Sequence, residues 1–163
     1  MSLIPIVTYP NKILRKKSQK ISDPASEEIK NLILDMGETM IKNEGIGLAA
    51  PQIGKNIRLF VVNTKEGIEA WINPKIVWKS RYKQIGEEGC LSIPKVFGPV
   101  KRFTEIKLEA QNSDGEKISF HAEGLYARVI QHEIDHLDGV LFIDKSKGIT
   151  SGKDLLEQYE KLQ

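Results

Sequence analysis

Apolar residues recur at helical spacing in two stretches of the chain. The first follows Asp23 and Pro24, which are typical of a helix N-terminus, and it ends near Gly45. Its apolar residues are Ile29, Leu32, Ile33, Met36, Met40 and Ile41. The second predicted helix covers residues 124–137, and Gly139 is well placed to end it. Its apolar residues are Leu125, Val129, Ile130, Ile134 and Leu137.

Short segments between these two helices favour β-strands. They cover residues 57–63, 70–78, 105–110 and 117–122, with a hairpin turn expected at 112–115. A short strand at 140–143 and a polar terminal helix at 153–161 follow the second helix. Strands grouped between helices predict an α+β fold, in which antiparallel sheets pack around the 124–137 helix and other helices lie toward the N- and C-termini.

Length and charge narrow the class of protein. The 163 residues suit a single domain, 1–163, with a core that needs no disulfides. The formal charge is only +2, and basic and acidic residues are interleaved, so we expect no DNA partner. Cys90 is the only cysteine, and neither a signal peptide nor a membrane-spanning run is apparent. We therefore expect a soluble protein of a reducing, bacterial cytoplasm.

The strongest chemical signal lies inside the second predicted helix, at residues 132–136. His132 and His136 are four residues apart, which places both imidazoles on one helical face, where they can bind one metal ion. Glu133 lies beside them, where a carboxylate can take a proton from a water at the metal and pass it on. The run H-E-x-x-H therefore predicts two metal ligands and one general base. His121, the third histidine, is expected to be a strand residue without a metal role.

A catalytic metal needs a third protein ligand and one open position. Asp138 and Asp144 follow the motif, but Asp138 is too near His136 to reach the same ion easily. Cys90 is the better candidate, because a thiolate is a strong ligand for such metals. Judged alone, however, a single cysteine is more often a buried structural residue.

Three segments together resemble the motifs of the peptide deformylase family. They are E-G-C-L-S at 88–92, G-I-G-L-A-A-P-Q at 45–52 and the run from Gln131 to Gly139. H-E-x-x-H alone is shared by many hydrolases, whereas this combination, in this order, is highly specific. The resemblance also includes Pro10, Leu14, Arg15 and Arg102, so it covers nearly the whole chain.

The resemblance implies an enzyme that removes the formyl group from the formylmethionine of nascent polypeptides and releases formate. Cys90, His132 and His136 would hold one divalent metal ion, with Fe(II) favoured and Zn, Ni or Co also accommodated. Glu133 would be the general base. Gln52 and the backbone N–H of Leu91 would donate to the developing oxyanion.

The resemblance also implies a cleft in which the peptide adds to a strand edge. Its expected lining residues are Gly45, Ile46, Gly47, Gly89, Leu125 and Val129. Of these, Ile46, Leu125 and Val129 could equally be core residues. Arg128 is expected at the rim, and Lys95 and Phe97 depart from other members, which leaves the preference beyond the first substrate residue open.

Three further interpretations follow from the sequence. Ribosome contact is expected to be transient at most, because Lys153, Lys161, Glu157 and Glu160 balance the charge of the terminal helix. One rival function is a zinc endopeptidase of another family, against which the missing downstream ligand argues. The other is a non-catalytic module with a structural metal, but such sites normally have four protein ligands.

Overall fold

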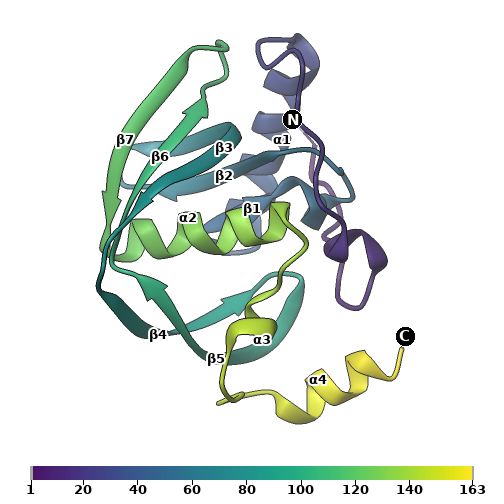
Figure 1. Ribbon diagram of the computed structural model, residues 1–163. Helices are drawn as coiled ribbons and strands as arrows, with labels where there is room; N and C mark the ends of the chain where they lie inside the picture. Colours follow the sequence, from purple (N-terminus) through teal and green to yellow (C-terminus); the bar gives the residue numbers. More distant parts are fainter. Residues whose placement is uncertain (1, 163) are drawn as a thin grey trace.

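Two antiparallel sheets form the framework of the computed structural model, which describes residues 2–162 (Figure 1). The larger sheet has the strand order β1-β2-β3-β6-β7, and the smaller is the hairpin β4-β5. The strands are β1 (Gly47–Ala49), β2 (Leu59–Thr64), β3 (Gly67–Lys79), β4 (Lys83–Cys90), β5 (Ile93–Phe103), β6 (Glu105–Gln111) and β7 (Lys117–Glu123).

Four α-helices accompany these sheets in the described residues. They are α1 (Glu27–Lys42), α2 (Gly124–Leu137), α3 (Phe142–Lys145) and α4 (Lys153–Glu160). Helix α2 lies between the larger sheet and the β4-β5 hairpin, whereas α4 lies at the periphery below α3 (Figure 1). The predicted α+β architecture with a central helix is therefore confirmed. No helix within residues 2–162 is long and apolar enough to cross a membrane.

The core positions α2 through its apolar face. Ile130 and Leu137 are fully buried against residues of the larger sheet, including Phe60 and Leu108. Burying one such side chain contributes about 1.5–3 kcal/mol, so this face fixes the rotation of the helix. The opposite face of α2 is thereby turned toward β4 and β5, away from the sheet.

Most predicted elements have the expected type. Helix α2 occupies 124–137 as predicted, and the four expected strands correspond to β2, β3, β6 and β7 with ends shifted by a few residues. The expected hairpin turn is also present, because the Gly115 N–H donates to the Asn112 carbonyl at 3.0 Å. Helix α4 follows the predicted terminal helix closely.

Both ends of α1 and the type of one predicted element differ from the prediction. Helix α1 begins at Glu27, after Asp23 and Pro24, because the Ser26 hydroxyl caps it by accepting from the Ile29 N–H at 3.4 Å. It ends at Lys42, before Gly45. The strand expected at 140–143 is wrong. That segment enters the short helix α3, whose first turn is closed by an Asp144 carboxylate that accepts from the Leu141 N–H at 2.9 Å.

Strands β4 and β5 were not predicted from the sequence. Their glycines and prolines weaken the strand pattern, because proline cannot donate to a sheet ladder and glycine offers no side chain to pack. The two strands nevertheless pair along their length, from Lys83 opposite Phe103 to Cys90 opposite Ile93. Val96 and Val100 of β5 are buried in the core below α2. This pairing carries Cys90 to the face of α2 that bears His132 and His136.

Candidate metal centre and substrate cleft

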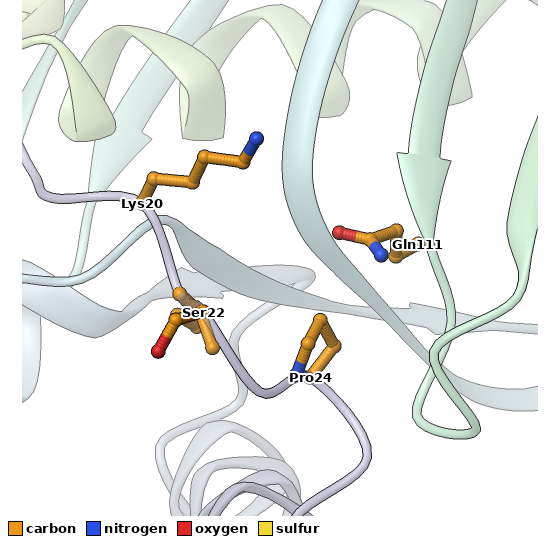
Figure 2. Close-up of a pocket in the computed structure, with 5 residues that line it drawn as sticks. Lys20, Ser22, Pro24 and Gln111 are labelled. Carbon is orange, nitrogen blue, oxygen red and sulfur yellow. The ribbon is translucent and has the colours of Figure 1, made fainter.

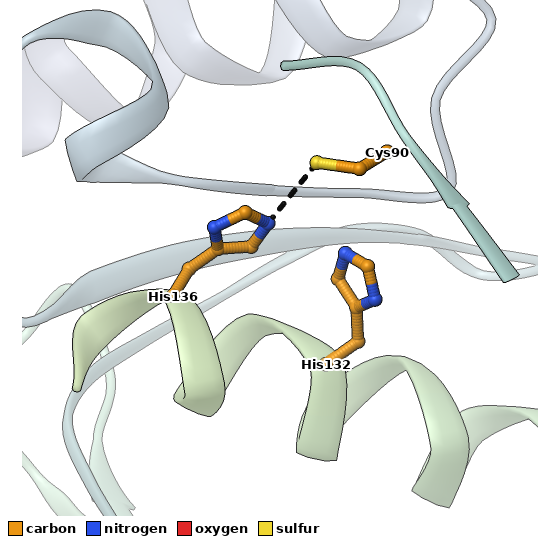
Figure 3. A group of neighbouring side chains, drawn as sticks. All are labelled: Cys90, His132 and His136. Atoms are coloured by element: carbon orange, nitrogen blue, oxygen red, sulfur yellow. Dashed lines mark hydrogen bonds between the residues drawn. The ribbon is translucent and has the colours of Figure 1, made fainter. Parts of the chain in front are cut away.

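Two histidines of α2 and one cysteine of β4 converge on a single point. His132 and His136 project from the same face of the helix, and Cys90 at the end of β4 faces them (Figure 3). One ligand atom from each residue lies within 4.8 Å of the other two. The Cys90 Sγ lies 3.2 Å from Nε2 of His136. The structure thus brings together the three residues that the sequence singles out as metal ligands.

His132 is oriented by a carboxylate behind it. Its Nδ1 lies 2.8 Å from Oε1 of Glu88, which leaves Nε2 free to face the cluster. Burial opposes ionisation of Glu88, but hydrogen bonds from Arg102 and His132 outweigh burial and hold its pKa well below the usual range. Glu88 therefore stays charged, and it fixes the imidazole in the orientation that a metal ligand requires.

Glu133 is buried at the same site without a partner for one of its oxygens. Its Oε2 finds no hydrogen bond within the described chain. Burial, the largest influence, raises the pKa of Glu133 to about 7. The carboxylate lies directly over Gly47, where an added Cβ would meet Glu133 Oε1 at 2.5 Å. The side chain is thus held against the backbone of β1 and can exchange a proton near neutral pH.

Gln52 presents its amide to the cluster from the side of β1. Its Oε1 accepts from the Ala49 N–H at 2.9 Å, which fixes the orientation of the amide. Its Nε2 lies 3.4 Å from Cys90 Sγ and 3.2 Å from Ser92 Oγ. Without the family resemblance, Gln52 has no signal beyond its place in a glycine-rich segment. The structure makes it a buried donor beside the cysteine.

The cluster fits a divalent metal ion. Burial, helped by the charge of His132, lowers the pKa of His136 well below its usual value, so its imidazole is neutral and keeps a lone pair for a cation. For His132, burial acts in the same direction, but hydrogen bonds with Cys90 and Glu88 outweigh it. The pKa of His132 is therefore raised to about 10. A cation among the three ligands would take the place of that proton. One thiolate and two imidazoles leave a position open, as catalytic sites require.

A cavity of about 740 Å³ opens onto this cluster. All six predicted cleft residues line it, namely Gly45, Ile46, Gly47, Gly89, Leu125 and Val129. Ile46 and Leu125 are 50% and 64% exposed, so they are surface residues of the cleft and do not belong to the core, whereas Val129 is 9% exposed. The cavity is also lined by residues to which the sequence analysis assigns no specific role, namely Asn43, Glu44, Glu87, Glu88 and Pro94.

The other sequence-predicted residues lie as follows. Leu91 follows Cys90 and lines the cavity, as do Arg128, Lys95 and Phe97. His121 lies on β7, outside the cluster, with its ring 5.4 Å from that of Trp78.

A second cavity lies elsewhere and has a different chemistry. It encloses about 350 Å³ and is lined by Lys20, Ile21, Ser22, Pro24 and Gln111. Figure 2 shows Lys20, Ser22 and Pro24 along one loop segment, with Gln111 opposite them on β6. Its lining contains no histidine, cysteine or carboxylate, so it offers neither a metal ligand nor a general base.

The fold and this site define the class of the protein. Two histidines of an H-E-x-x-H helix, a cysteine that faces them and a buried glutamate beside an open cleft are the arrangement of a metal-dependent hydrolase. The sequence model described as "Polypeptide deformylase" matches residues 3–151. The chain belongs to the peptide deformylase family, whose members remove the N-formyl group from formyl-methionyl nascent peptides.

Individual relatives agree with this assignment. A peptide deformylase of Acetivibrio thermocellus is 50% identical over 135 residues, which cover 83% of this chain and 78% of that protein. A peptide deformylase of Aquifex aeolicus is 43% identical, with 96% of this chain and 95% of that protein covered.

Solved structures show the same similarity in three dimensions. The peptide deformylase of Thermotoga maritima is 40% identical, with a TM-score of 0.88, and 91% of this chain and 100% of that chain are covered. A peptide deformylase of Synechococcus elongatus in complex with actinonin has a TM-score of 0.87 at 34% identity, covering 97% of this chain and 84% of that chain.

Proposed function

We propose that Cys90, His132 and His136 hold one divalent metal ion and that Glu133 is the general base of deformylation. The observation that carries the proposal is the position of Glu133, whose buried carboxylate has one oxygen without a partner beside three converging side chains. A metal ion held by these three residues would supply Lewis acidity toward water and the formyl carbonyl. The remaining chemistry comes from residues of the chain.

The substrate backbone lies between β1 and β4 in this proposal. Strand β1 pairs only with β2 among the described strands, so its other edge is free to pair with an extended peptide. Gly45, Ile46 and Gly47 line the cleft on this side, and Gly89 lines it on the other. The methionine side chain then enters the space between Ile46, Leu125 and Val129.

Proton transfer runs through Glu133. Its carboxylate takes a proton from water while the water oxygen attacks the formyl carbon. As negative charge develops on the carbonyl oxygen, Gln52 Nε2 and the Leu91 N–H donate hydrogen bonds to it. The C–N bond then breaks, and Glu133 passes its proton to the departing amine, so that formate and a free α-amine leave.

The native metal in this proposal is Fe(II). One thiolate and two imidazoles also accept Zn, Ni or Co, so affinity alone does not select the ion. The family resemblance favours iron. A thiolate ligand at an iron site is sensitive to oxidation, so protein purified in air is expected to lose activity or to contain zinc.

The test is formate release from formyl-Met-Ala-Ser by anaerobically purified protein, with metal content measured on the same sample. Wild type is expected to release formate. Glu133→Gln preserves side-chain volume and is expected to keep the metal but to lose turnover. His121→Ala is the matched control, since it removes a histidine outside the cluster, and it is expected to behave like wild type. Near-normal turnover by Glu133→Gln would refute the assignment of the base.

The same protein distinguishes the two rival functions. Cleavage of casein without formate release would indicate an endopeptidase. Full metal occupancy without either activity would indicate a structural metal in a binding module.

We further propose that the chain acts as one catalytic domain in the cytoplasm and meets its substrate through transient ribosome contact at most. The mixed charge of α4 and its C-cap, with Lys153 and Lys161 against Asp154, Glu157 and Glu160, supports weak contact. Co-sedimentation with ribosomes that resists moderate salt would contradict this part of the proposal.

A further inference from the structure

The connection between β3 and β4 carries a local excess of positive charge. Residues 70–86 include four basic side chains and no acidic one, although the formal charge of the chain is only +2. Lys79 ends β3, Lys83 begins β4, and Arg81 lies between them. All three are exposed, and none belongs to an ion pair within the described part of the chain. We name residues 78–83 the basic turn.

Two cations of the basic turn are held close together on one aromatic ring. The ammonium groups of Lys79 and Lys83 lie 5.1 and 4.5 Å from the centroid of the Phe103 ring. They are therefore within about 10 Å of each other, which is about one Debye length, so the two charges still repel. An anion that bound at the turn would relieve this repulsion.

The buried Ser80 fixes the backbone of the basic turn. Its N–H donates to the Glu105 carbonyl at 3.0 Å. Its hydroxyl donates to the Tyr82 carbonyl at 2.8 Å and accepts from the Glu105 N–H at 3.1 Å. The Thr104 N–H also donates to the Tyr82 carbonyl, at 3.1 Å. The turn is therefore ordered before any partner arrives, so it loses little conformational entropy on binding.

Two aromatic side chains stand exposed on this fixed backbone. Tyr82 is 75% exposed and Trp78 is 46% exposed. The Trp78 ring lies 5.4 Å from the ring of His121, which limits its freedom. Nucleic-acid bases stack on such rings with little regard to sequence, while neighbouring lysines contact the phosphates. Exposed rings beside unpaired cations favour single-stranded RNA over an acidic polypeptide, because a polypeptide of carboxylates offers no bases to stack.

We propose that the basic turn binds single-stranded RNA on the ribosome, with its two aromatic rings against bases and its three cations against phosphates. This inference rests on the proposed function, because nascent peptides emerge where ribosomal RNA is exposed. Figure 1 shows the connection from β3 to β4 at the left edge of the molecule, away from both termini. Strand β4 runs its eight residues from the turn to Cys90, a distance of roughly 23 Å. RNA at the turn therefore leaves the cleft open, since residues 78–83 do not line it.

The phosphate contacts are tested by the salt dependence of binding. The measurement is the fluorescence anisotropy of a labelled oligouridylate of about 10 nucleotides, titrated with metal-loaded protein at several salt concentrations. Wild type is expected to bind at low salt and to weaken as salt rises. Lys79→Gln combined with Lys83→Gln removes two phosphate contacts, so the slope of log affinity against log salt should become shallower by about 1.4. No binding by wild type, or an unchanged slope in the double variant, would refute the proposal.

The stacking contact has its own pair of variants. Tyr82→Ala removes the ring and is expected to lower the affinity about tenfold without changing the salt slope. Tyr82→Phe keeps the ring and removes only the hydroxyl, so it is expected to bind like wild type. Equal losses in these two variants would contradict stacking on the Tyr82 ring.

Lys16→Gln combined with Lys17→Gln is the matched control for charge. Both lysines are exposed, and they lie at the other end of α2 from the basic turn. The neighbouring Ser18 N–H donates to the Leu137 carbonyl at 2.7 Å, whereas the Gly124 N–H donates to the Thr104 carbonyl at 3.1 Å. The control is expected to bind RNA like wild type, and a loss equal to that of Lys79→Gln with Lys83→Gln would overturn the assignment.

Competition and sedimentation test the choice of partner. Polyglutamate should displace the oligouridylate far less well than unlabelled oligouridylate does, and equal displacement would indicate an acidic polypeptide instead. Co-sedimentation with purified ribosomes at low salt should fall in Lys79→Gln with Lys83→Gln but not in the control pair. Equal co-sedimentation of the two double variants would overturn the ribosome as the source of the RNA.

Formate release separates this inference from the proposed function. Every variant of the basic turn is expected to release formate from formyl-Met-Ala-Ser like wild type, because none of its residues lines the cavity. The same assay therefore shows that each variant is folded. Failure of wild type to release formate would overturn the function, whereas normal formate release without RNA binding would overturn only the inference.

Discussion

Arg102 is expected to be one of the residues whose loss destabilises the fold most. Its side chain is 3% exposed, and that of Glu88 is 6% exposed. It donates to the two Glu88 oxygens at 2.9 and 2.8 Å and to Asp135 at 2.5 Å. Arg102→Met keeps the volume but leaves both carboxylates without this cation. Removing one partner of a buried ion pair costs about 3–5 kcal/mol, because an uncompensated charge stays buried.

Urea unfolding of metal-loaded protein measures this loss, with the metal content matched between samples. Arg15→Met is the control, because Arg15 and Asp144 form an ion pair at 41% and 37% exposure. Such exposed pairs contribute about 0–1 kcal/mol. A loss of less than about 1 kcal/mol in Arg102→Met would refute the reasoning. Combining Arg102→Met with Glu88→Gln should cost less than the sum of the two single changes, because the two side chains contact each other and the second change removes a charge that the first deprives of its bidentate partner.

Three further predictions concern the site and its surroundings. Gly47→Ala should reduce kcat by an order of magnitude or more, because the added methyl group would lie 2.5 Å from Glu133 Oε1. The measurement is steady-state kinetics on metal-loaded protein, and an unchanged kcat would contradict this prediction. Cys90→Ser should lose the metal ion rather than the fold, so metal analysis should show low occupancy while circular dichroism stays native. Burial raises the pKa of Asp144, but the Arg15 guanidinium outweighs it and lowers the pKa below the usual value. The Arg15–Asp144 pair therefore stabilises the protein at pH values above the unfolded-state pKa of Asp144, and this contribution is lost as the pH falls through the lower folded-state pKa. The urea midpoints of wild type and Arg15→Met should accordingly converge below about pH 4.

The sequence predicts best those elements whose pattern is local. Helix α2 was predicted at its observed bounds, because a helix period and a following glycine mark both its face and its end. The prediction of a strand at 140–143 was wrong because so short a run carries no clear period. A short apolar run is compatible with a strand or a buried helical turn. The turn forms here because the Leu141 N–H donates to the Asp144 carboxylate and the Ser146 N–H donates to the Phe142 carbonyl.

The site residues also differ in how far local sequence pattern predicts them. His132, Glu133 and His136 follow from helical spacing alone. The chemistry of a thiolate made Cys90 the better candidate for the third ligand, but only the family resemblance favoured that role over a structural cysteine. Gln52 required the resemblance entirely, because residues so far apart in sequence become neighbours only in the folded chain. The support behind the site shows this limit most clearly, since Glu88 reaches His132 across 44 residues of sequence.

The hairpin β4-β5 was missed for a reason connected with its function. Gly86 hides the strand signal, yet it provides the space in which the Arg128 guanidinium reaches the hairpin. Pro94 and Pro99 weaken the strand pattern further, while Pro94 lines the cleft. A regular strand with large alternating side chains would have been easier to predict, but a side chain at position 86 would displace the arginine that holds Glu88. The irregular composition of this hairpin is therefore a consequence of its position between α2, which carries His132 and Arg128, and the cleft.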